Sequence, residues 1–253
     1  MKFIAIIPAR YASTRFPAKP LALLGGKPII QRVYERVSQA FEHVCVATDD
    51  DRIYEAVKSF GGQVVMTSTS HRSGTDRCYE AYGKLGVEAD VVVNVQGDEP
   101  FIDLSQLEEI KHCFDDVTTQ IATLVKPFAA DAPFEAIANP NSPKVVVSND
   151  DYALYFSRSV IPYLRGIPQE EWVAKHRYLK HIGLYAYRTE VLKDITSMPQ
   201  GELEQCESLE QLRWLQAGLR IKVGYTDVET IGIDTPEDLQ RAENFLKNNN
   251  WFY

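Results

Sequence analysis

The stretch DVVVNVQGDEP, residues 90–100, passes from an apolar run to a polar turn. Consecutive valines without alternation predict a strand that is buried on both faces, as in a parallel sheet. Asp98 and Glu99 follow directly, next to Gly97. Because ligands of open α/β sheets bind beyond the carboxyl ends of the strands, this stretch predicts a buried strand with a polar site at its end.

Similar apolar runs alternate with helical patterns through the first half of the chain. We expect further strands at residues 2–7, 43–48 and 63–67, and helices at about 28–37, 51–60 and 76–84. Asp49 to Asp51 suit a helix start, Gly61 and Gly62 suit its end, and Gly25 to Lys27 suit a turn. This order predicts an α/β fold with a mostly parallel central sheet flanked by helices.

The second half of the chain is less regular. Residues 128–143 contain three prolines and predict a loop, whereas residues 144–148, 152–156 and 183–188 resemble strands and residues 205–216 a helix. We therefore expect a single domain, residues 1–253, in which the second half adds a smaller lobe for substrate or a subunit contact.

Composition narrows the class of protein. The 253 residues are 45% hydrophobic and 25% charged, with a net charge of −8, which disfavours general binding to nucleic acids. No apolar run is long enough to cross a membrane, and the N-terminus lacks the pattern of a signal peptide, so we expect a cytoplasmic protein with no membrane partner. The four cysteines and five histidines lack the spacing of a zinc site or a disulfide framework.

The loop after the first strand, PARYASTRFPAKP at residues 8–20, carries Arg10, Arg15 and Lys19. Small residues separate these cations, including Ala9 and Ser13, and they let backbone amides approach a ligand. Three cations at a strand end are suited to a polyphosphate. The alternative is a solvated basic loop. The loop matches neither the P-loop nor the G-x-G-x-x-G pattern, which disfavours a P-loop ATPase and a dinucleotide-binding domain.

A second loop, HRSGTDR at residues 71–77, precedes a helix. Ser73 or Thr75 can cap that helix, and Gly74 leaves room for a planar or phosphate ligand at its N-terminus. Capping alone also explains these residues.

Two acidic residues are candidate metal ligands. Asp98 ends a buried strand, and Asp234 lies in TIGIDTPEDL, after what we expect to be a short strand and before a helix capped by Thr235. Mg²⁺ prefers oxygen ligands and binds through one or two carboxylates together with phosphates. The alternative is that Asp98 or Glu99 caps a turn.

The chain resembles the 3-deoxy-manno-octulosonate cytidylyltransferase family, also called CMP-Kdo synthetases. The resemblance rests on seven motifs that occur in one order from residue 7 to residue 239: IPARYASTRFPAKPL, SGTDR, VNVQGDEP, ALYFSR, KHIGLYAY, LEQLR and IDTPEDL. One departure is Ala18, where many members have glycine, and it bears on the backbone conformation of the first loop.

The resemblance implies a Rossmann-like nucleotidyltransferase fold, similar to glycosyltransferase-A folds, and a function in lipopolysaccharide biosynthesis. The enzyme would transfer CMP from CTP to 3-deoxy-D-manno-octulosonate (Kdo), release pyrophosphate, use Mg²⁺ and form a homodimer. Residues 1–127 and 220–247 would form the nucleotide-binding core, and residues 128–219 the sugar-binding and dimerisation lobe.

The resemblance also implies roles for individual residues. Arg10, Arg15 and Lys19 would bind the CTP phosphates and, with the Mg²⁺ ligands Asp98 and Asp234, would be catalytic. Ala9, Ser13, Ser73, Gly74, Arg77 and Gln96 would complete the nucleotide site. The sugar would be surrounded by Gln96, Arg158, His181, Tyr185, Glu210 and Gln211.

Three alternatives stay open. A cytidylyltransferase for a related sugar acid, such as the 8-amino derivative of Kdo, would have much the same sequence. A nucleotide-sugar glycosyltransferase would ordinarily present a D-x-D metal motif, whereas this strand ends in Gln96-Gly97-Asp98. A catalytically silent nucleotide-binding module would not need the two carboxylates.

Overall fold

The computed structural model describes residues 1–12, 15–229 and 231–248. The chain forms two compact units: Met1–Glu108 together with the segment after Glu229, and Glu109–Glu229. The functional division at about residues 127 and 220 stays a prediction. Among the helices of the described ranges, none is both long and apolar enough to cross a membrane.

The first unit contains a parallel sheet. Its strands are β1 (Phe3–Ala9), β4 (Val44–Thr48), β5 (Val64–Met66) and β6 (Val91–Asn94). Strand β1 pairs in parallel with β6 on one side and with β4 on the other, and β4 pairs in parallel with β5. Because these strands run in the same direction, the loops that follow β1 and β6 leave the same edge of the sheet side by side.

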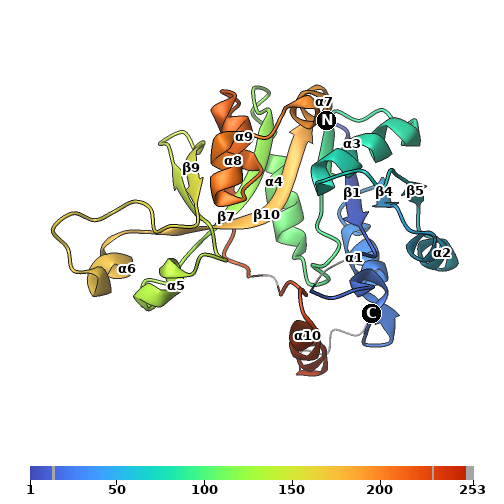
Figure 1. Ribbon diagram of the computed structural model, residues 1–253, viewed down its shortest axis with the longest axis horizontal. Helices are drawn as coiled ribbons and strands as arrows, with labels where there is room; N and C mark the ends of the chain where they lie inside the picture. Colours follow the sequence, from blue (N-terminus) through green and yellow to red (C-terminus); the bar gives the residue numbers. More distant parts are fainter. Residues whose placement is uncertain (13–14, 230, 249–253) are drawn as a thin grey trace. The chain divides into compact units, whose positions relative to one another are not determined.

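Helices pack against these strands: α1 (Ile29–Val37), α2 (Asp51–Ser59) and α3 (Gly74–Leu85). Helix α10 (Pro236–Asn248) also belongs to this unit, whereas α4 (Leu104–His112) includes the boundary between the two units at Glu108. Figure 1 shows α2 beside β4 and β5. The side chain of Asp50 accepts a hydrogen bond at the N-terminus of α2, and Gly61, at the predicted end of the helix, takes a left-handed conformation. The turn at Gly25 and Gly26 joins the two-residue strands β2 (Leu23–Leu24) and β3 (Lys27–Pro28).

The second unit contains a mixed sheet. Its strands are β7 (Ile121–Pro127), β8 (Lys144–Val147), β9 (Ala153–Ser157), β10 (Leu179–Arg188) and β11 (Ile221–Tyr225). Strand β11 pairs in parallel with β7, whereas the pairs β10–β7, β10–β8 and β8–β9 are antiparallel. The register of β10 against β7 shifts between Ile182 and Tyr185, which is a β-bulge. The predicted α/β fold with a mostly parallel sheet flanked by helices is confirmed.

Two predictions for the second half were wrong. Residues 128–143 contain the helix α5 (Phe134–Ala138), because Ile137 is buried in an apolar cluster with Trp172 and Tyr178. Residues 205–216 form two helices, α8 (Glu202–Glu207) and α9 (Gln211–Gln216), because Ser208 adopts a left-handed conformation with φ of 49° that interrupts helical hydrogen bonding. The remaining helices of the unit are α6 (Trp172–Lys175), α7 (Thr189–Ser197) and a 3₁₀ turn at Gln169–Glu171.

Candidate active site

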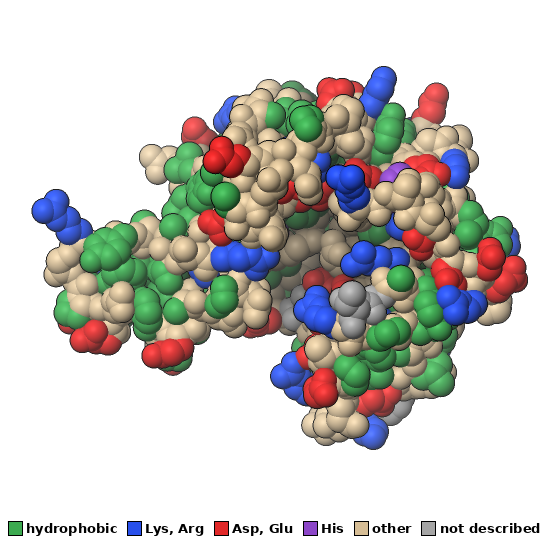
Figure 2. Space-filling model, viewed as in Figure 1, with side chains coloured by type: hydrophobic (Ala, Val, Ile, Leu, Met, Phe, Trp, Pro, Cys, Tyr) green, Lys and Arg blue, Asp and Glu red, His purple; other side chains and the backbone are tan. Residues whose placement is uncertain are grey.

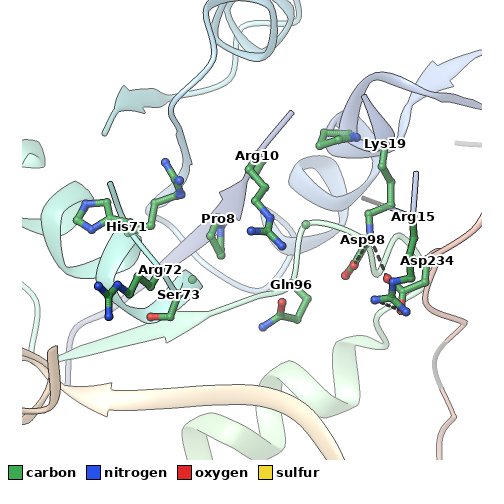
Figure 3. A pocket seen from close by; sticks show the side chains of 15 residues that line it. Pro8, Arg10, Arg15, Lys19, His71, Arg72, Ser73, Gln96, Asp98 and Asp234 are labelled. Carbon is green, nitrogen blue, oxygen red and sulfur yellow. Dashed lines mark hydrogen bonds and ion pairs between the residues drawn. The ribbon is translucent and has the colours of Figure 1, made fainter. Parts of the chain in front are cut away.

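A pocket of about 300 Å³ lies in the first unit, at the ends of β1 and β6 and the N-terminus of α3. Figure 3 shows basic side chains along its length and the two predicted metal ligands at one end. The lining residues are Pro8, Ala9, Arg10, Arg15, Lys19, Pro20, His71, Arg72, Ser73, Gly74, Arg77, Gln96, Gly97, Asp98 and Asp234. The structure therefore brings together every described residue that we predicted for the nucleotide; Ser13 lies outside the described residues.

The loop after β1 is folded back on itself by backbone hydrogen bonds. The Ala18 N–H donates to the Tyr11 carbonyl at 3.0 Å, and Lys19 begins a short 3₁₀ helix, Lys19–Leu21. Ala18 has φ of 59°, a left-handed conformation that glycine adopts at lower cost. The departure of this motif from glycine therefore leaves the turn in place and adds local strain. This turn directs the Lys19 side chain into the pocket.

Lys19 joins the two predicted metal ligands. Its ammonium lies 2.6 Å from Asp98 Oδ2 and 3.1 Å from Asp234 Oδ1, and Arg15 lies 3.2 Å from Asp234 Oδ2. Figure 3 shows these four side chains pointing toward one another. Two carboxylates that are 136 positions apart in the sequence thus share one cation.

The predicted strand before Asp234 was wrong, since residues 231–233 are not in a strand. A single backbone hydrogen bond, from Ile233 N–H to the Asp98 carbonyl at 2.9 Å, holds this segment beside the end of β6. The predicted cap of α10 is present, because the Asp238 N–H donates to Thr235 Oγ1 at 3.2 Å. Asp238 in turn accepts a hydrogen bond from the Asp234 N–H at 3.0 Å, which fixes the backbone of that residue.

The donor set fits Mg²⁺. Asp98 and Asp234 supply hard carboxylate oxygens, and the Lys19 ammonium shows that one positive charge can contact both. Within the described ranges, no group of three or more His, Cys, Asp and Glu side chains is arranged to hold a metal on its own. Mg²⁺ needs no such cage, because it retains waters and takes phosphate oxygens as further ligands.

The opposite end of the pocket is formed by the N-terminus of α3. Ser73 caps the helix, with its Oγ accepting from the Asp76 N–H at 3.1 Å. Arg77 is buried and donates to Asp49 at 2.7 Å and to Thr67 at 2.5 Å, so its guanidinium is held in place by protein groups. A helix N-terminus with exposed N–H groups favours an anion or a polar ring edge.

Two basic side chains of the pocket are available to a ligand. Arg10 and Arg72 have no hydrogen-bond or ion-pair partner among the residues that the structure describes, and both are exposed. The sequence prediction missed Arg72 and its neighbour His71, although both stand immediately before the predicted cap Ser73. Five arginine and lysine residues against two acidic residues make the pocket suitable for a polyanion.

Gly97 allows the loops that follow β1 and β6 to approach each other closely. A Cβ at this position would lie 2.8 Å from the Pro8 carbonyl oxygen, so only glycine lets the chain after β6 pass the end of β1. Gln96 and Asp98, on either side of this contact, are thereby placed on the pocket wall with Ala9.

The predicted sugar residues of the second unit lie on β10, at the start of α9 and, for Arg158, directly after β9. The His181 and Tyr185 rings are 5.3 Å apart, and the Tyr185 ring is 5.3 Å from Trp214 of α9. Burial raises the pKa of Tyr185 well above its ordinary value. Gln211, also on α9, is buried. The His181, Tyr185 and Trp214 rings form one aromatic cluster, and the sequence prediction missed Trp214, which an amphipathic helix pattern alone does not distinguish from core.

Arg158 and Glu210 are engaged in local contacts. Arg158 donates to the carbonyls of Glu207, Pro140 and Ser208 at 2.6, 2.8 and 3.2 Å, so it braces the turn between α8 and α9. Glu210 accepts from Arg213 at 2.7 Å. A role for Arg158 in holding a sugar carboxylate would have to use the guanidinium N–H groups that these contacts leave.

The chain matches a known family over most of its length. The family model described as cytidylyltransferase matches residues 4–221. Among curated relatives, the 3-deoxy-manno-octulosonate cytidylyltransferase of Bacteroides thetaiotaomicron is 68% identical and covers 98% of this chain and 99% of its own. The protein of the same name from Phocaeicola vulgatus is 69% identical and covers 98% of each chain.

Solved structures show similarity to the same family. A CMP:2-keto-3-deoxy-manno-octonic acid synthetase complexed with CTP has a TM-score of 0.89 at 44% identity, covering 98% of this chain and 99% of that one. The 4-diphosphocytidyl-2C-methyl-D-erythritol synthase from Anaerococcus prevotii has a TM-score of 0.61 at 14% identity, which shows a shared fold alone. The resemblance drawn from the seven motifs is confirmed: the chain belongs to the 3-deoxy-manno-octulosonate cytidylyltransferase family.

Proposed function

We propose that this protein transfers CMP from CTP to Kdo and releases pyrophosphate, as a transferase of lipopolysaccharide biosynthesis. The observation that carries this proposal is the pocket of the first unit, where five arginine and lysine side chains line the same pocket as the Asp98 and Asp234 carboxylates. Family membership supports the choice of CTP and of Kdo.

Binding of the nucleotide CTP is assigned to the first unit. Arg10 and Arg72 offer guanidinium forks to phosphate oxygens, and the N-terminus of α3 at Ser73 and Gly74 offers backbone N–H groups. The buried Arg77 is fixed by Asp49 and so forms a rigid wall. Rigid donors favour a single orientation of the α-phosphate, which in-line attack requires.

Mg²⁺ bound at Asp98 and Asp234 would neutralise phosphate charge and acidify the attacking hydroxyl. In the structure these two carboxylates form ion pairs with Lys19 and Arg15. A triphosphate offers both cations new acceptors. We therefore propose that Lys19 and Arg15 turn to the phosphates when CTP binds and leave the carboxylates to the metal.

The chemical step is a displacement at phosphorus. The anomeric hydroxyl of Kdo loses its proton to water and its oxygen forms a bond to the α-phosphorus. The bond from that phosphorus to the bridging oxygen breaks, and pyrophosphate leaves with the electron pair. An anionic sugar acid must approach an anionic triphosphate, so charge neutralisation and alignment dominate the barrier. Arg10, Arg15 and Lys19 supply that neutralisation in this proposal.

The sugar contacts are assigned to Gln96, Arg158, His181, Tyr185, Glu210 and Gln211. Two buried donors of the second unit support this assignment: Gln211 Nε2 and Trp214 Nε1 have no hydrogen-bond partner within the part of the chain that the structure describes. Buried donors are almost always paired in folded proteins, so two unpaired ones on α9, of which Trp214 packs against Tyr185, support a polar ligand.

We further propose a homodimer that works in the cytoplasm. Apolar side chains gather over α5, α6 and the segment that joins them, as Figure 2 shows at the left, and Tyr163 there is 73% exposed. Exposed apolar patches of this kind often mark protein contacts. The four cysteines carry thiols rather than disulfides, which suits a reducing compartment.

Pyrophosphate release measured with four nucleoside triphosphates and several sugar acids tests the proposal. We expect release to require CTP, Kdo and Mg²⁺ together. Preference for the 8-amino derivative would keep the reaction class and change the acceptor. Absence of pyrophosphate release with every combination, from protein that binds CTP, would refute the proposal.

A further inference from the structure

Thr123, which no sequence motif singled out, lies beside the predicted sugar residues. It is fully buried on β7 and pairs in register with Tyr185 of β10, next to the bulge between Ile182 and Tyr185. Bulges often occur beside active sites, where they redirect side chains. Thr123 is therefore placed to contact the part of β10 that carries His181.

The Thr123 hydroxyl has only one proton and lies among four polar neighbours, one of which is the Tyr185 hydroxyl. Its Oγ1 lies 2.9 Å from the Leu184 carbonyl oxygen, 3.2 Å from the Ile182 carbonyl oxygen and 3.0 Å from His181 Nε2. Carbonyl oxygens only accept hydrogen bonds, so the hydroxyl proton is directed to them. The hydroxyl oxygen must then accept from His181, which places a hydrogen on Nε2 and leaves Nδ1 with its lone pair.

The imidazole ring of His181 is neutral at physiological pH. Burial lowers the pKa of His181 to about 3, and the rings of Phe156 and Tyr185 lie 5.2 and 5.3 Å from it. Among described residues, Nδ1 has no hydrogen-bond partner. A neutral ring with a free lone pair accepts a hydrogen bond and cannot donate one at that atom.

We infer that Thr123 is a positioning residue, which holds His181 as the Nε2–H tautomer so that Nδ1 accepts a hydrogen bond from a hydroxyl group of the sugar acid. This inference rests on the proposed function, since it takes the sugar acid as the ligand at His181. In this arrangement His181 contacts a hydroxyl group of the sugar acid, and the sugar carboxylate is bound by other hydrogen-bond donors. Buried N–H groups of Gln211 and Trp214 are available nearby for acceptor oxygens of the same ligand.

Three variants test the inference in the full-length protein. Thr123→Val removes the hydroxyl and keeps the shape, Thr123→Ser keeps the hydroxyl, and Thr119→Val is the control. Thr119 is also buried in this unit, but its hydroxyl donates to the Cys113 carbonyl at 2.8 Å. We expect Thr123→Val to raise the KM for Kdo about tenfold or more, with little change in the KM for CTP, and Thr123→Ser and Thr119→Val to stay near the unaltered protein.

Nuclear magnetic resonance of the ¹⁵N-labelled histidine rings supplies a readout that does not depend on turnover. The unaltered protein should show His181 as the Nε2–H tautomer, assigned by loss of its signals in His181→Gln, and Thr123→Val should lose that preference. An Nδ1–H tautomer in the unaltered protein overturns the inference, as does a Kdo KM in Thr123→Val no higher than in Thr119→Val. Absence of turnover with Kdo overturns the proposed function, whereas the ring spectrum still decides whether Thr123 sets the tautomer.

Discussion

Replacing Lys19 by methionine should destabilise the ligand-free protein and make its stability depend on magnesium. The substitution keeps the length of the side chain and removes the ammonium that Asp98 and Asp234 share. The Lys19 side chain is only 13% exposed, whereas those of Asp98 and Asp234 are 29% and 46% exposed. The contact with Asp98 is thus the better shielded of the two.

The expected loss follows from these exposures. A shielded charged hydrogen bond contributes about 1.5–3 kcal/mol. The more exposed contact with Asp234 contributes roughly 0.2–1 kcal/mol, because solvent screens it and Arg15 remains at 3.2 Å. The free energy of unfolding should therefore fall by about 2–3 kcal/mol in the absence of metal. Mg²⁺ should restore much of this loss, because two carboxylates without their ammonium attract a divalent cation.

Urea denaturation with a chelator and with millimolar Mg²⁺ measures both effects. Lys27→Met is the matched control: Lys27 contacts Glu35 at 2.7 Å, outside the pocket, with both side chains about one-third exposed. It should cost less than about 1 kcal/mol and should not respond to Mg²⁺. If Lys19→Met is no less stable than Lys27→Met and is indifferent to Mg²⁺, the shared-cation account of Asp98 and Asp234 is refuted.

Three further predictions concern single side chains. Asp98→Asn should fold normally and reduce pyrophosphate release by at least about a hundredfold, because a metal ligand loses its charge; near-normal turnover would remove Asp98 from the mechanism. Arg15→Ala should weaken the use of CTP by roughly 2–4 kcal/mol, measured as kcat/KM, and an unchanged dependence on CTP concentration would contradict its phosphate role. Hydrogen bonds from Lys180 and Lys126 lower the pKa of Glu229 from its ordinary value of 4.5 to about 2. The ionised carboxylate therefore stabilises the fold at pH values above its unfolded pKa. This stabilisation is lost as the pH falls through about 2. Glu229→Gln should therefore lower the free energy of unfolding by about 1 kcal/mol at neutral pH, because the carboxylate is 56% exposed and screened by solvent. In urea titrations, the difference in unfolding free energy between the variant and the unaltered protein should disappear on acidification, and a constant difference would contradict this account.

The elements of the first unit follow from local sequence. Runs such as Val91–Asn94 become buried strands because every side chain in them is apolar or small enough to pack on both faces. Helix starts follow from short-range hydrogen bonds, as at Asp50 and Ser73, whose side chains reach the backbone two or three residues ahead. These forces act within a few residues, so a sequence pattern reports them directly.

Local patterns failed where distant packing decided the conformation. The proline-rich stretch around Ile137 forms a helix because Ile137 is buried against Trp172. Ser208 takes a left-handed conformation that ends a helix in a regular helical pattern, and its carbonyl accepts a hydrogen bond from the distant Arg158. The segment before Asp234 needs no strand, because one hydrogen bond to the Asp98 carbonyl holds it. The residues that decide these conformations are too far away in the sequence for a local periodicity of apolar residues to reveal them.

The sequence by itself therefore determined the α/β class, the strands and helices of the first unit, and the types of side chain at the strand ends. Only the tertiary structure decided that Lys19 would contact both Asp98 and Asp234, that Arg158 would donate hydrogen bonds to backbone carbonyls, and that the Thr123 hydroxyl would lie within hydrogen-bond distance of His181. The physical reason is that local structure depends on neighbours in the chain, whereas the convergence of side chains depends on strand order, on bulges and on the burial of residues far apart in sequence.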